Sequence, residues 1–242
     1  MSKERLDLLE NAVKAELYKM AAFERLIHGH SHDPITDGVI DIDRYLSSSP
    51  KMLWILKEPW DDVKDGKTSG GWSVTQLVED KIDDGQIGNK GLYARMAYVT
   101  YSVFNDYAGW KDIDWVTDDP MVGETLRSIA YVNVSKFPGT TRSDPAKIAI
   151  AYERHRSILL KQIDIINADV MIFGNVLHLF IDDLGIKSDE LKSEGSVESC
   201  IKDGRLYINA YHPSYWSISG EKYVDDIVAV IKKNRQDSEP LR

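Results

Sequence analysis

Apolar residues recur at intervals of three and four in several long segments of the chain, which is the period of an amphipathic α-helix. In the first segment, Leu6, Leu9 and Val13 are spaced in this way. In a later one, Asp144 supplies an N-cap and Pro145 occupies the first helical position, where an N–H would have no partner. The predicted helices cover residues 3–28, 92–105, 145–166 and 221–234.

Short apolar runs without alternation lie between these helices. Such runs are typical of strands that are covered on both faces. Because strands and helices alternate, we predict an α/β fold: a three-layer α/β/α sandwich with a central, mostly parallel four-stranded sheet. We find no internal repeat and no linker, so residues 1–242 are expected to form a single domain, with the N-terminal helix packed on it. The predicted strands are 52–56, 129–133, 169–173 and 206–210.

The composition narrows the class of protein. The chain has 242 residues, of which 43% are apolar, enough for a sizeable core. No stretch approaches the roughly 20 apolar residues that span a bilayer, and the N-terminus lacks the pattern of a signal peptide, so we expect a cytoplasmic protein without membrane contacts. The single cysteine, Cys200, excludes an internal disulfide and a cysteine-type metal centre.

The formal net charge of -9 argues against broad, sequence-independent binding of nucleic acid, because affinity for phosphates comes from Lys and Arg. Any contact with DNA is therefore expected to be local, on a small basic rim around a pocket.

Polar residues follow each predicted strand. In an open parallel sheet, ligands bind beyond the carboxyl ends of the strands, where the connecting loops converge. Three of the four loops carry groups that are able to do chemistry or to recognise a base. The loops begin with Lys57-Glu58-Pro59-Trp60, Asn133-Val134-Ser135-Lys136, Gly174-Asn175 and Tyr211-His212-Pro213-Ser214.

These loops, in this order, resemble the motifs of the uracil-DNA glycosylase superfamily over roughly residues 50 to 235. Leu56-Lys57-Glu58-Pro59-Trp60 is similar to the G-Q-D-P-Y motif, and Tyr131 to Lys136 with Pro138-Gly139 is similar to N-V-V-K-x-x-P-P-G of the cluster-containing branch. Ala168 to Gly174 looks like that branch's next strand, and Ala210 to Ser214 resembles the H-P-S motif. Gly71-Trp72-Ser73 stands where the family carries a stacking aromatic residue.

The resemblance implies a role for each residue. Glu58 and His212 would be catalytic: a carboxylate steers water and stabilises an oxocarbenium-like sugar, and an imidazole stabilises the departing base. Trp60, Trp72 and Asn133 would bind the base by stacking and by pairing with its polar edge. Lys136, Ser214 and Trp216 would contact the phosphates or the duplex of DNA.

The implied activity is hydrolysis of the N-glycosidic bond of uracil or a related base, in single- or double-stranded DNA or in a small nucleobase-containing molecule, without a cofactor or metal. The sequence departs from the family at Glu58, which replaces a shorter Asp, at the adjacent cation Lys57, and in lacking the cluster cysteines. Two alternatives stay open: a noncatalytic nucleic-acid or nucleotide-binding module, and a hydrolase of a small N-glycoside.

Single residues also have plainer interpretations. Asn133 is compatible with a strand-end cap, Lys136 with a solvated surface charge and Trp72 with the core. His28, His30 and His32 with Asp33 form a run that is able in principle to ligate a metal, but we interpret it as a polar loop, since the spacing requires an extended backbone to aim all three rings one way.

Overall fold

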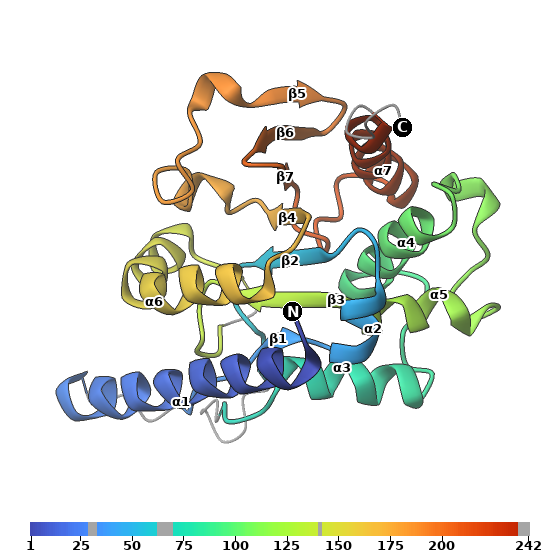
Figure 1. The fold of residues 1–242 in the computed structure, drawn as a ribbon. Coiled ribbons are helices and arrows are strands. Elements are labelled where there is room, and N and C mark those ends of the chain that lie inside the picture. Colours follow the sequence, from blue (N-terminus) through green and yellow to red (C-terminus); the bar gives the residue numbers. More distant parts are fainter. Residues whose placement is uncertain (29–32, 62–69, 140–141, 237–242) are drawn as a thin grey trace.

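A computed structural model describes residues 1–28, 33–61, 70–139 and 142–236. The fold is α/β, as predicted, and is built on one mixed sheet with the strand order β1-β3-β2-β4-β7-β6-β5 (Figure 1). Its seven strands are β1 (Gly38–Val39), β2 (Met52–Leu56), β3 (Ile129–Asn133), β4 (Val170–Gly174), β5 (Lys192–Glu194), β6 (Val197–Lys202) and β7 (Arg205–Ala210).

The prediction of four strands is wrong in number. The four predicted strands correspond to β2, β3, β4 and β7, which pair in parallel as the centre of the sheet. Three shorter or more polar strands, β1, β5 and β6, pair antiparallel at its two sides. β1 has only two residues, and all three residues of β5 are exposed, so neither has the apolar run that marks a buried strand.

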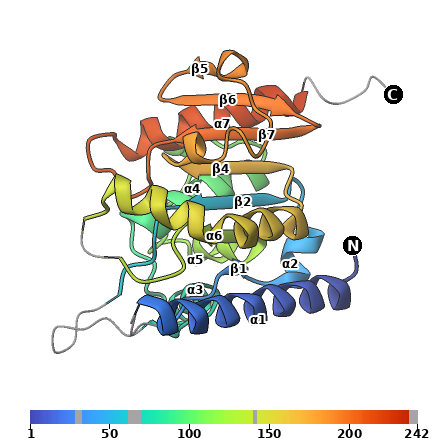
Figure 2. The same ribbon diagram turned by 90° about the vertical axis from the view of Figure 1, so that its left-hand side faces the viewer.

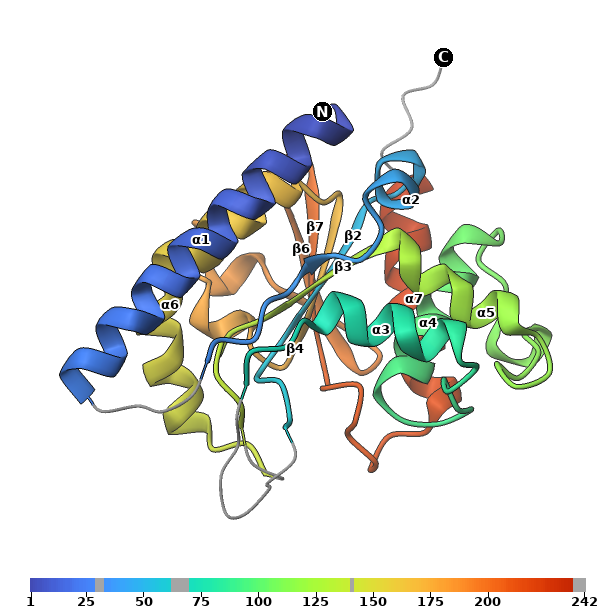
Figure 3. The same ribbon diagram turned by 90° about the horizontal axis from the view of Figure 1, so that it is seen from below.

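Helices cover both faces of the sheet (Figure 3). On one face lie α1 and α6, and on the other lie α3, α4, α5 and α7. Their bounds are α1 (Lys3–His28), α2 (Ile42–Ser47), α3 (Val74–Asp83), α4 (Leu92–Phe104), α5 (Pro120–Glu124), α6 (Pro145–Ile166) and α7 (Gly220–Gln236).

Alternation along β2 divides its buried side chains between the two layers. Met52, Trp54 and Leu56 belong to the core that includes α4 and α7, whereas Leu53 and Ile55 belong to the core that includes α1 and α6. All five are completely buried, and each such apolar side chain contributes about 1.5–3 kcal/mol to folding. The sheet therefore separates two hydrophobic cores.

The predicted caps of α6 form. The Asp144 carboxylate accepts a hydrogen bond from the Ala146 N–H at 3.0 Å, and Pro145 begins the helix. Asn167 ends it in the left-handed conformation at φ 50°, a position that Asn tolerates better than most residues. None of the described helices combines the length and the apolar character needed to cross a bilayer.

Candidate functional site

The carboxyl ends of the four parallel strands lie at one edge of the sheet, where the strands stand side by side in the order β3, β2, β4, β7. Figure 2 shows β2, β4 and β7 in this order. Adjacent strands are about 4.8 Å apart, so about 14 Å separates the end of β3, with Asn133, from the end of β7, before His212. This edge is the candidate site, since it brings the loops with the predicted catalytic residues together.

The loops after β2 and β3 continue side by side beyond the sheet. The Ser135 N–H donates to the Lys57 carbonyl at 2.8 Å, and the Gly139 N–H donates to the Pro59 carbonyl at 2.8 Å. Gly139 lies directly against Glu58: a Cβ on this glycine would be 2.2 Å from Cδ of Glu58. The half-buried Glu58 side chain therefore packs directly against Gly139, and a larger residue at position 139 would have to displace it.

His212 is half-buried in the loop after β7. Burial, and then the positive charge of Lys57, lower the pKa of His212 to about 4. Its Nδ1 accepts a hydrogen bond from the Ser214 N–H at 3.2 Å. The neutral imidazole thus carries its proton on Nε2, which makes that nitrogen a hydrogen-bond donor at neutral pH.

Gly174, the last residue of β4, fills the space between the ends of β2 and β7. A Cβ here would lie 2.5 Å from Cδ2 of Leu56 and 3.4 Å from Cδ2 of His212. The absence of a side chain therefore leaves room for Leu56, and His212 lies at van der Waals distance from the end of β4.

Asn133 ends β3 on the sheet face that carries Tyr131, and it is completely buried. Neither its amide nitrogen nor its amide oxygen has a hydrogen-bond partner among the described residues. Burial raises the pKa of the Tyr131 hydroxyl well above its usual value, which the nearby Asn133 amide offsets slightly without reaching hydrogen-bond geometry. An unpaired buried polar group costs about 1–3 kcal/mol, so a partner for this amide would be stabilising.

Lys136 lies on the other side of the loop after β3, away from solvent. Its ammonium donates to both carboxylate oxygens of Asp37, at 2.7 and 2.9 Å, and both side chains are almost completely buried. Asp37 also accepts from Gln162 Nε2 at 2.9 Å and from the Asn133 N–H at 2.8 Å. Lys136 is therefore not positioned to contact a phosphate in this conformation, and it anchors the end of β3 instead.

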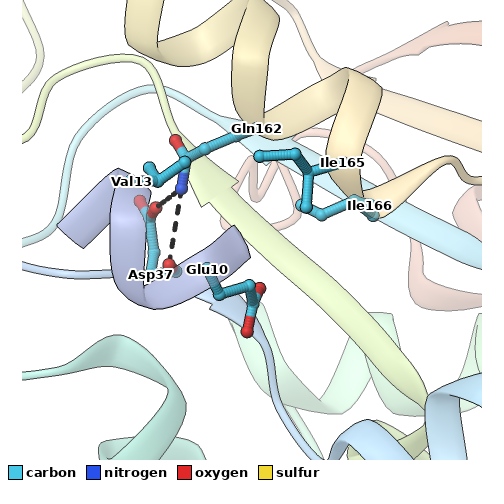
Figure 4. Close-up of a pocket in the computed structure, with 6 residues that line it drawn as sticks. All are labelled: Glu10, Val13, Asp37, Gln162, Ile165 and Ile166. Atoms are coloured by element: carbon cyan, nitrogen blue, oxygen red, sulfur yellow. Dashed lines mark hydrogen bonds between the residues drawn. The ribbon is translucent and has the colours of Figure 1, made fainter. Parts of the chain in front are cut away.

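The Asp37 cluster borders a cavity of about 10 Å³, the size of one water molecule (Figure 4). Figure 4 shows Gln162 of α6 pointing toward Asp37, with Glu10 of α1 nearby. Glu10 accepts from the Val39 N–H at 2.8 Å, and burial raises its pKa to about 7. Asp37, Gln162 and Glu10 were not anticipated from the sequence, because isolated polar residues in a helix or loop give no signal of burial.

The predicted aromatic residues lie in different environments. Trp60 and Trp216 are 59% and 87% exposed and are open to a ligand. Trp72 is half-buried against the core beside α4, and its carbonyl accepts from the Thr36 N–H, on the far side of the β3 loop from His212. Ser214 is exposed in the His212 loop. Of the three aromatic residues that were predicted for the site, Trp72 is therefore the one that packs on the core.

The run His28, His30, His32 lies largely outside the described residues: 29–32 are not described, nor is the side chain of His28. Among the described residues, no group of His, Cys, Asp or Glu is arranged to hold a metal ion. The sequence matches no model of a known protein family and no curated protein.

Proposed function

We propose that the chain hydrolyses the N-glycosidic bond of uracil or a related base in DNA, with the fold and site of the uracil-DNA glycosylase-like superfamily. His212 stabilises the departing base, and Glu58 orients the attacking water. The observation that carries this proposal is the hydrogen bond from the Ser214 N–H to Nδ1 of His212, which leaves Nε2 of the neutral imidazole as the donor.

A neutral donor suits this reaction. As the glycosidic bond breaks, negative charge develops on the carbonyl oxygen of the pyrimidine, and a preorganised hydrogen bond to that oxygen stabilises the transition state more than the ground state. The Ser214 N–H fixes the tautomer of His212, so the donor is in place before the bond breaks. Such a group contributes on the order of 10²–10³ to the rate.

The reaction also requires a carboxylate near the sugar and a group that recognises the base, and Glu58 and Asn133 supply them. Packing against Gly139 keeps the Glu58 carboxylate at this edge of the sheet, where a negative charge would stabilise an oxocarbenium-like sugar and direct water to it. The unpaired amide of Asn133 offers one donor and one acceptor, the pattern that complements the polar edge of a uracil ring.

A second candidate, a hydrolase of a small nucleobase-containing molecule, is favoured by one observation. The ion pair with Asp37 occupies Lys136, which removes one of the cations expected to bind DNA phosphates. The salt dependence of substrate affinity separates the two, since phosphate contacts weaken strongly with added salt.

The test uses single- and double-stranded oligonucleotides that contain one uracil, with abasic sites revealed by alkali. The wild type is expected to release uracil, and His212→Ala and Glu58→Gln to lose on the order of 10²-fold in rate. The matched controls His178→Ala and Glu153→Gln change exposed residues of the same type elsewhere and keep wild-type rates. No abasic product from the wild type, or equal rates in all four variants, refutes the proposal.

A further inference from the structure

A second hollow lies in the helical layer, between α4 and the segment that follows it. Its volume is about 190 Å³, and its lining residues are Tyr98, Trp110, Lys111, Ile113 and Trp115. None of these residues belongs to the loops that follow the parallel strands. A cavity of about 150 Å³ already accepts a molecule of the size of benzene, so this space is large enough for a small organic group.

Three aromatic rings form the walls. The Tyr98 and Trp110 rings lie 4.8 Å apart at 65°, and the Trp115 ring lies 6.2 Å from Tyr98 at 75° and 5.8 Å from Trp110 at 85°. The three ring planes are thus close to mutually perpendicular, like the sides of a corner. Trp115 is 43% exposed, Trp110 is half-buried and Tyr98 is 2% exposed, so the corner opens to solvent along the two indoles and the Tyr98 ring forms its floor.

The groups around this corner are acidic. The carboxylates that contact the lining residues include Glu221, paired with Lys111, and Asp225, which accepts the Trp110 N–H. Asp118 lies close enough to the Tyr98 hydroxyl to contribute to the raised pKa of that group, after the larger effect of burial. The local field therefore favours a positively charged occupant.

Lys111 does not provide that charge inside the corner. Its ammonium pairs with Glu221 at the start of α7 at 3.1 Å, and its side chain is 81% exposed. Asp225, one turn further along α7, accepts the backbone N–H of Trp110 at 3.0 Å and so holds this ring beside the helix. The rings are thus fixed by the fold before any ligand arrives.

We propose that the Tyr98–Trp110–Trp115 corner binds the trimethylammonium group of a small molecule. A quaternary ammonium has no N–H to satisfy, is attracted by the negative faces of aromatic rings, and gains from nearby carboxylates. The one charged lining residue, Lys111, is already paired with Glu221, so an anionic ligand gains less here than a cation does.

Calorimetry with choline and with 3,3-dimethyl-1-butanol, its neutral carbon analogue, tests this at constant ionic strength. The two probes have the same shape, so only the charge separates them. Choline is expected to bind about threefold to thirtyfold more tightly, the range that a cation–π interaction of about 0.7–2 kcal/mol gives. Adenosine monophosphate serves as an anionic aromatic competitor and is expected not to bind in the corner.

Trp115→Leu removes the exposed ring, and Asp118→Asn removes one carboxylate without changing the packing. Both are expected to weaken choline binding, whereas Tyr18→Leu, which removes an exposed ring on α1, leaves it unchanged. Thermal unfolding verifies that each variant is folded. Equal affinity for the two probes, displacement of bound choline by the nucleotide, or choline binding that survives both Trp115→Leu and Asp118→Asn overturns the proposal.

Discussion

Replacing Lys136 by Met removes the charge from the buried ion pair while keeping most of the apolar stem. The side chains of Lys136 and Asp37 are 0% and 1% exposed, so the Asp37 carboxylate would be left without a counter-charge and without water. Removal of one member of a buried pair typically costs about 3–5 kcal/mol. We expect about 3 kcal/mol for Lys136→Met, because Gln162 Nε2 and the Asn133 N–H still donate to Asp37.

Urea unfolding of Lys136→Met, Asp37→Asn and the double variant measures this energy. The double variant removes both charges, so its loss of stability is expected to be smaller than the sum of the two single losses by about 2 kcal/mol. Burial lowers the pKa of Lys136, which the Asp37 carboxylate opposes, and Asp37→Asn therefore also makes the buried ammonium easier to deprotonate.

Lys161→Met is the matched control, because Lys161 pairs with Glu16 at the surface with both side chains more than 40% exposed. We expect its effect to stay below about 1 kcal/mol. A loss of stability in Lys136→Met no larger than that of Lys161→Met, or strict additivity in the double variant, would show that the pair does not hold the end of β3.

Three further predictions concern pH and steric fit. Burial raises the pKa of Glu10 to about 7 from an unfolded value of 4.5. The protonated carboxyl therefore stabilises the folded state fully below pH 4.5, and this stabilisation is lost as the pH rises through 7, which lowers the free energy of unfolding by about 3 kcal/mol. Urea titrations across this pH range are expected to show that decrease in the wild type and not in Glu10→Gln. In NMR titrations His212 is expected to protonate only near pH 4, and Lys57→Met to raise that pKa; protonation near 6.5 would contradict the buried, neutral imidazole. Gly139→Ala places a methyl group 2.2 Å from Cδ of Glu58 and displaces that side chain, so the rate of uracil release is expected to fall to the level of Glu58→Gln. An unchanged rate would show that catalysis does not depend on the position of the Glu58 carboxylate against Gly139.

The periodicity of apolar residues located the main elements closely. The predicted segment 145–166 corresponds to α6, Pro145–Ile166, because its caps and its spacing agree. The strands that were missed are those in which tertiary pairing, not apolar content, stabilises the structure. β5, Lys192–Glu194, has no buried residue, and its backbone is ordered by pairing with β6.

The candidate site was predictable only in part. The edge that carries Glu58 and His212 follows from strand order, since the carboxyl ends of parallel strands meet. The burial of Lys136 does not follow, because its partner Asp37 lies 99 positions earlier in a loop with no distinctive pattern. The neutral state of His212 likewise depends on burial and on Lys57, which only the folded chain reveals.

The two edge strands of the sheet, β1 and β5, also affect whether the protein aggregates at high concentration. An outer strand with free backbone groups invites the same strand of a neighbouring copy, which is how many β-rich proteins form fibrils. Here β5 is three residues long and presents the charged Lys192 and Glu194, and β1 offers only two residues. Neither margin provides the long, flat, uncharged template that such polymerisation requires, so self-assembly by strand addition is disfavoured.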